Sequence, residues 1–134
     1  MVFILPVLLL IGSGCALFTS GGREVAGPAQ ALVGHWRLAD GGGEVYFTAN
    51  GIYSFMDQNG NSGRATYRVT GEDPETRTVT TLIRLMEYNQ QPVDGVVEMT
   101  VTGTFSKNYR THTGESVAAP GSPPRTIVMK YVAP

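Results

Sequence analysis

A β-hairpin is predicted by the stretch Tyr46-Phe47-Thr48-Ala49-Asn50-Gly51-Ile52-Tyr53-Ser54-Phe55, where the turn-forming pair Asn50-Gly51 separates two segments rich in aromatic and β-branched residues. A three-residue loop over residues 49–51, with Gly51 in the left-handed conformation, would pair Phe47 with Tyr53 and Val45 with Phe55. This register gathers large side chains on one face, whereas a two-residue turn would place Phe47 opposite Ser54. The three-residue loop is therefore the predicted register.

Similar short segments follow one another along most of the chain. The predicted strands are residues 32–38, 44–48, 52–57, 64–69, 77–88, 97–105, 109–113 and 126–132. No convincing helix interrupts them, and the links have hairpin length. This pattern predicts an all-β fold, an antiparallel barrel or sandwich of about eight strands. Gly103 falls in the inward-facing series of its strand, where a glycine predicts a bend or bulge.

Some of these segments are similar to a known family. Gly34-His35-Trp36 is similar to the Gly-X-Trp element of lipocalin-like proteins, and residues 46–55 resemble the strand-turn-strand that follows it in small bacterial lipocalin-like lipoproteins. Residues 129–132 also fit the end of such a chain. The resemblance covers about residues 32–132 and implies a small antiparallel up-and-down β-barrel with Trp36 packed at its closed end. The long second region of a full lipocalin is missing, so the resemblance implies neither a roomy cavity nor a ligand.

Aromatic side chains dominate the predicted inward face. The candidate interior or ligand-lining residues are Trp36, Phe47, Tyr53, Phe55 and Tyr67. A small barrel needs its interior filled by side chains, so core packing is the simpler role for them. The alternative is that they line a pocket for a small apolar ligand.

The chain begins with an uncharged apolar run from Val2 to Ile11 that ends in Gly12-Ser13-Gly14-Cys15, and Cys15 is the single cysteine of the sequence. This arrangement resembles a bacterial lipoprotein signal peptide, in which the cysteine is lipidated before the peptide is cut in front of it. Lipoprotein signals usually carry an aliphatic residue where Gly12 stands, and they have basic residues before the apolar run. An uncleaved membrane anchor is therefore the other interpretation.

The sequence divides into three regions. Residues 1–15 are a signal peptide or membrane anchor, residues 16–31 a flexible tether rich in glycine and small polar residues, and residues 32–134 the barrel domain. Cys15 is the predicted lipidation site. The implied location is the bacterial cell envelope, with the domain held at the membrane on its periplasmic or extracellular side.

Charge and motifs do not indicate an enzyme. The formal net charge of -1 gives no electrostatic basis for nucleic-acid binding. His35 and His112 are the only histidines, and neither has a Cys or His at metal-ligand spacing, so both are expected on the surface or at a strand edge. The oxygen-rich residues 57–61 lack the distal glutamate of a calcium loop and predict a turn. The sequence therefore predicts no catalytic residue, cofactor or metal ion.

One predicted strand is apolar on both faces. When Ile83 and Leu85 fill the interior, Leu82 and Met86 face outward on either side of Arg84. A two-faced strand needs a second cover, which could be the tether folding back, an unrecognised helix or another protein. If another protein covers it, Leu82, Arg84 and Met86 are the candidate partner-binding residues. Two functions remain open: a noncatalytic accessory subunit that docks on an envelope or membrane protein complex, which the two-faced strand favours, and a lipocalin-like binding protein for a small apolar ligand.

Overall fold

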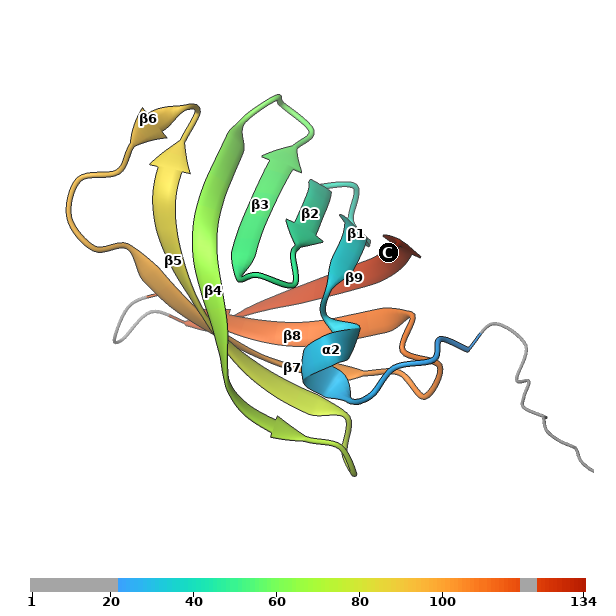
Figure 1. The fold of residues 1–134 in the computed structure, drawn as a ribbon. Helices are drawn as coiled ribbons and strands as arrows, with labels where there is room; N and C mark the ends of the chain where they lie inside the picture. Colours follow the sequence, from blue (N-terminus) through green and yellow to red (C-terminus); the bar gives the residue numbers. More distant parts are fainter. Residues whose placement is uncertain (1–21, 119–122) are drawn as a thin grey trace, which may run out of the picture.

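The computed structural model describes residues 22–118 and 123–134, and these residues are nearly all β-sheet (Figure 1). The elements are α2 (Pro28–Ala31), β1 (Gly34–Leu38), β2 (Gly43–Phe47), β3 (Ile52–Asp57), β4 (Ser62–Asp73), β5 (Thr78–Tyr88), β6 (Gln91–Pro92), β7 (Glu98–Phe105), β8 (Thr111–Val117) and β9 (Arg125–Ala133). Among the described residues, no helix has the length and the apolar character needed to cross a membrane. Cys15 lies outside the described residues.

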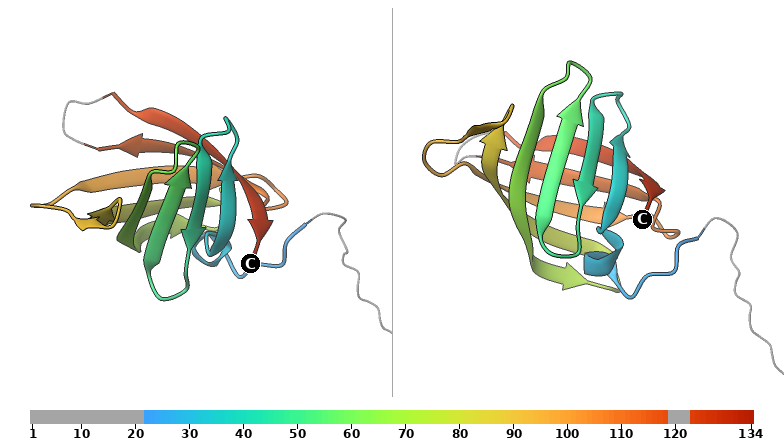
Figure 2. Two further views of the ribbon diagram at one scale, coloured as in Figure 1. Left: turned by 90° about the horizontal axis from the view of Figure 1, so that it is seen from above. Right: turned by 45° about the horizontal axis from the view of Figure 1, so that its top comes forward.

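The strands form a closed antiparallel barrel. Their order in the sheet is β4-β3-β2-β1-β9-β8-β7-β5, and pairing of β4 with β5 closes it, while the short strand β6 adds to the end of β5. Each barrel strand pairs with its neighbours in sequence, and β9 returns to β1. Strands β1 to β4 cross in front of β7 to β9 in Figure 2, with the interior between them. The predicted fold class, an up-and-down barrel of eight strands, is therefore confirmed.

The predicted hairpin has the predicted register. Val45 pairs with Phe55 and Phe47 with Tyr53. The backbone N–H of Thr48 donates to the carbonyl of Ile52 at 2.9 Å, which leaves residues 49–51 as the loop. Gly51 has φ +91°, a conformation that favours glycine. Local turn chemistry therefore sets which side chains of β2 and β3 face the interior.

Two strands extend beyond their predicted ends. β4 continues to Asp73, because a register shift between Val69 and Gly71 lets the chain pass the glycine and stay paired with β5. β8 continues to Val117, and its inward residues after His112 are Gly114 and Ser116. These residues are small or polar, so hydrophobic alternation does not reveal them.

Gly103 lies in a regular part of β7. It pairs with Val79 of β5 and with Gly114 of β8, and neither ladder shifts its register there. The regular register therefore contradicts a bulge at Gly103, one of the two irregularities expected there. The absent side chain of Gly103 instead leaves space for the ring of His112.

The segment before β1 closes one end of the barrel. Its residues 22–31 were expected to be a tether, yet Pro28, Ala31 and Leu32 are buried and α2 packs against β4 and β5. Trp36 is fully buried beside this segment, and its Nε1–H donates to the carbonyl of Leu32 at 2.8 Å. Burial of these apolar side chains holds the segment against the barrel.

Polar contacts fix the same segment. One guanidinium nitrogen of Arg23 donates to the carbonyls of Ala31 and Tyr109, both at 2.9 Å, and the guanidinium lies 3.6 Å from the ring centroid of Tyr131. The backbone N–H of Ala29 donates to the Glu72 carboxylate at 3.0 Å. The β1–β2 loop and the end of β3 lie at the opposite end, around the mouth. Residues 22–134 thus hold every described strand, the closing segment and the buried core, so we expect them to fold as one unit.

Candidate functional site: the barrel interior

A cavity of about 530 Å³ lies inside the barrel. Its inner end includes Leu32 of the closing segment, and Phe47, Ile83 and Met129 contribute to its apolar wall. Small-molecule sites in proteins commonly have volumes of about 300–1,000 Å³ and mostly apolar walls. The interior therefore has the size and the lining of a site for a small apolar molecule.

The predicted interior aromatic residues divide into two groups. Phe47, Tyr53 and Phe55 line the cavity. Trp36 and Tyr67 belong to the surrounding core: Trp36 meets Tyr131 edge to face at 5.3 Å, and Tyr67 meets Phe47 at 5.0 Å. The Tyr67 hydroxyl donates to a backbone carbonyl of the β2–β3 loop. Three of the five predicted residues thus line the cavity, and the other two pack in the core around it.

A glycine makes room for one of these rings. Gly63 pairs with Phe55 across β3 and β4, and a Cβ atom at Gly63 would lie 2.2 Å from a ring carbon of Phe55. Any larger residue there would push the ring away, so the ring of Phe55 rests over Gly63. This shows that the inner wall accepts a phenyl ring above a strand glycine.

His112 is a buried polar residue on the cavity wall, although its sequence context predicted a position on the surface or at a strand edge. Its exposed fraction is 3%, and it lies near the closed end at the start of β8. Its ring meets Phe105 at 5.0 Å and Trp36 at 6.4 Å, both edge to face. Nδ1 of His112 has no hydrogen-bond partner among the described residues. Burial lowers the pKa of His112 to about 4, so the imidazole is neutral at neutral pH.

Two glycines hold the space that the His112 ring occupies. A Cβ atom at Gly103 would lie 2.2 Å from His112 Nε2, and one at Gly114 would lie 2.9 Å from Cε1. These glycines face each other on β7 and β8, and both follow the inward series of their strands. An inward pair of glycines on adjacent strands is the sequence signal that would have indicated a large ring here.

The other polar groups inside the barrel are uncharged. Thr81 is 3% exposed and lines the cavity from β5. Burial raises the pKa of Tyr53 to about 12, so its phenol stays protonated at neutral pH. The inner part of the site therefore offers neutral hydrogen-bonding groups among apolar side chains.

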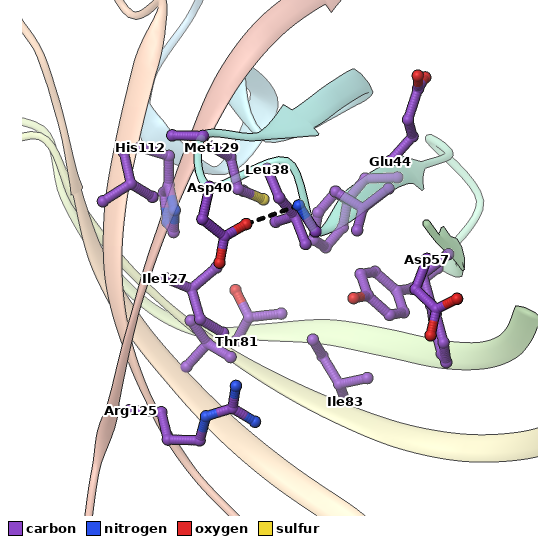
Figure 3. A pocket seen from close by; sticks show the side chains of 18 of the residues that line it. Leu38, Asp40, Glu44, Asp57, Thr81, Ile83, His112, Arg125, Ile127 and Met129 are labelled. Atoms are coloured by element: carbon purple, nitrogen blue, oxygen red, sulfur yellow. Dashed lines mark hydrogen bonds between the residues drawn. The ribbon is translucent and has the colours of Figure 1, made fainter. Parts of the chain in front are cut away.

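The charged lining residues lie at strand ends around the mouth. Figure 3 shows Asp40, Asp57 and Arg125 around the cavity, whereas the Glu44 carboxylate points away from it. The Asp40 carboxylate accepts the Gly42 N–H at 2.7 Å. The Asp57 carboxylate accepts several hydrogen bonds from the following turn, which lower its pKa, the side chain of Asn61 contributing most. Both carboxylates therefore already accept hydrogen bonds from the turns in which they lie.

His35 lies on the outer face of β1. Its ring stacks on Tyr46 at 4.3 Å, and its Nε2 contacts the Glu44 carboxylate. This hydrogen bond is the main reason why the pKa of Glu44 is lowered. The two histidines of the chain are therefore on opposite faces of the barrel wall.

Of the candidate partner-binding residues, Leu82 and Arg84 lie on the outer face of β5, and Met86 lies at a register shift in the same strand. Leu82 is half-buried, Met86 is 38% exposed, and Arg84 pairs with Glu98 at 3.3 Å between Nε and Oε2. Ile83, between Leu82 and Arg84, lines the cavity. The outward positions of Leu82 and Arg84 agree with the sequence pattern, whereas Met86 is the extra residue of the register shift. The docking role of these residues stays a prediction.

No model of a known protein family, no curated protein and no solved structure matches the chain. The class of protein is therefore defined by the fold and the site alone: a closed antiparallel β-barrel with an interior cavity. The resemblance to lipocalin-like lipoproteins stays a prediction.

Proposed function

We propose that the barrel is a noncatalytic binding protein that holds a small, largely apolar molecule in its interior. The observation that carries this proposal is the cavity of about 530 Å³ inside the eight-stranded barrel. Side chains alone can fill a barrel of eight strands, so an open interior with apolar walls supports a ligand-holding role. The closing segment supports the same role, because its Leu32 lines the cavity from the closed end of the barrel.

The size of the site sets the affinity to expect. A ligand of about 20 non-hydrogen atoms that gains about -0.3 kcal/mol per atom binds with about -6 kcal/mol, which corresponds to a Kd of roughly 40 μM. Binding of this strength comes from contact with apolar walls. Measurements at micromolar concentrations are therefore appropriate.

The cellular location is part of the proposal and rests on the sequence. An apolar segment that ends in Cys15 would hold the domain at a membrane of the bacterial envelope. The described chain enters at the closed end, where the backbone N–H of Arg23 donates to the carbonyl of Asn108 in the β7–β8 turn. An anchor attached there would leave the mouth accessible to ligand.

An environment-sensitive dye tests the binding proposal. Residues 22–134 should bind N-phenyl-1-naphthylamine saturably and raise its fluorescence. Ile83→Trp should abolish binding, because it fills the cavity, while Leu82→Trp, the same change on the outer face of the same strand, should leave binding unchanged. Thermal unfolding checks that both variants are folded. Equal binding by both variants, or no binding by the unmodified domain, would contradict the proposal.

The alternative proposal is an accessory subunit that docks through Leu82, Arg84 and Met86. The exposure of Met86 and the outward position of half-buried Leu82 favour it. The dye experiment separates the two functions, because a docking subunit has no need of an open interior.

A further inference from the structure

We infer that the ligand carries one uncharged hydroxyl group, which enters the cavity first and hydrogen-bonds to the imidazole of His112. This inference rests on the proposed binding function and names the class of ligand. It begins from a feature that the fold does not require, a polar ring buried in an apolar wall.

The His112 imidazole has hydrogen-bonding capacity that the protein leaves unused. Its Nδ1 makes no hydrogen bond to another described residue, the side chain is only 3% exposed, and the residue lines the cavity. Buried polar groups are nearly always hydrogen-bonded, so one without a partner on a cavity wall indicates a group that arrives from outside the chain. The neighbouring ring of Phe105 has no hydrogen-bonding group, and the Nε1–H of Trp36 already donates to the carbonyl of Leu32.

The position of the imidazole is built into two strands. Gly103 and Gly114 are cross-strand partners in regular β-structure, where glycine weakens a strand. Their absent side chains leave the space of the His112 ring, with a Cβ at Gly103 only 2.2 Å from Nε2. Three positions on β7 and β8 are therefore adapted to place one polar ring on the inner wall.

A hydroxyl group fits this ring better than a charged group. A neutral imidazole has one donor and one acceptor nitrogen, and a hydroxyl can both donate and accept, so it satisfies either tautomer. The hydroxyl of Thr81 provides a second neutral group on the same inner wall. A carboxylate or ammonium group at this depth would lose its hydration and find no opposite charge to replace it. The charged lining residues Asp40, Asp57 and Arg125 lie at the mouth instead.

Three probes with the same apolar body test the inference: 4-hexylphenol, hexylbenzene and 4-hexylbenzoate, each used to displace N-phenyl-1-naphthylamine from residues 22–134 at neutral pH. The phenol should bind more tightly than the hydrocarbon and the carboxylate. In His112→Phe, the ratio of phenol affinity to hydrocarbon affinity should fall by about 3–10-fold, the value of one net hydrogen bond. The ratio isolates the polar contact, because any change in cavity shape affects both probes.

A matched control is the same substitution on the outer face, His35→Phe, which should leave the ratio unchanged. The phenylalanine ring of His112→Phe should fit, because Phe55 already rests over Gly63 in this barrel. If His112→Phe does not fold by thermal unfolding, His112→Leu is measured with the same probes.

The outcomes separate the ligand class from the function. An unchanged affinity ratio in the His112 variant would overturn the inference while dye binding upheld the function. The inference would also be overturned if 4-hexylbenzoate bound more tightly than 4-hexylphenol and lost affinity in Arg125→Ala. The head group of the ligand would then lie at the mouth and not beside His112. If the dye and all three probes fail to bind, the proposed function fails together with the inference.

Discussion

Acid should destabilise this barrel through His112, and the size of the effect follows from the burial of the ring. The unfolded chain takes up a proton near the ordinary pKa of 6.5, whereas burial holds the native pKa at about 4. Between these values the unfolded state binds more protons, so stability is full above pH 6.5 and falls as the pH decreases toward about 4. A difference of about 2.5 pKa units at 1.36 kcal/mol each gives a loss of about 3 kcal/mol.

Urea unfolding measures this loss. Trp36 is the single tryptophan and is fully buried near His112, so its fluorescence reports the unfolding of the core. The free energy of unfolding is measured from neutral pH to pH 4 for the wild-type protein and for His112→Phe. Carboxylates such as Asp57 titrate in both proteins, so their contribution cancels in the difference.

The two proteins should diverge as the pH falls. At neutral pH, His112→Phe should be as stable as the wild type or more stable, because it removes a buried polar group without a partner. By pH 4 the wild type should have lost about 3 kcal/mol relative to the variant. A difference that stays constant within about 0.5 kcal/mol would refute the burial of a neutral imidazole.

Three further predictions concern the wall, the outer face and the amino terminus. Gly103→Ala should lower the free energy of unfolding by about 1–3 kcal/mol in urea titrations, since its Cβ would overlap the His112 ring. An equal loss of stability in the His112→Ala background would show that the two positions do not interact. If the outer face of β5 docks on a partner, Leu82→Ser with Met86→Ser should release the protein from complexes isolated from solubilised membranes while its melting temperature stays unchanged; retention of the complexes would remove the docking role. Intact-mass spectrometry of membrane-extracted protein should give a chain that begins at acylated Cys15, and a species with the initiator methionine and an unmodified cysteine would leave the uncleaved anchor.

Local signals were enough to predict the hairpin and, from it, most of the fold. The Asn50-Gly51 turn determines the register of β2 and β3, and the alternation of apolar and polar residues then fixes which side faces the interior. Repeated hairpins of this kind close into a barrel because each strand needs two partners. For the same reason the outward position of Leu82 could be derived from its inward neighbour Ile83.

The closing segment could not be predicted because its signals are weak and its contacts are distant in the sequence. Gly27 and Pro28 are typical of a linker, and α2 is too short to show a helical period. What orders it is a set of long-range contacts, such as the hydrogen bonds from Arg23 to the carbonyls of Ala31 and Tyr109. Contacts between residues so far apart in the sequence depend on the folded barrel and cannot be inferred from local sequence patterns.

The cavity wall was missed for a different reason: its key residues contradict the pattern on which the fold prediction depends. Within a single strand, the alternation of apolar and polar residues makes Gly103 an interruption and predicts a surface position for His112. That pattern contains no information about the neighbouring strand. Across the β7–β8 ladder the same residues complement one another, with glycines on both strands beneath one imidazole. A buried polar side chain that packs over two glycines in a mostly apolar wall lowers the stability of the barrel, and sequences depart from such local rules mainly at functional sites. For that reason the departure at His112 points to the ligand more directly than the aromatic residues do, since those would be expected in any barrel core.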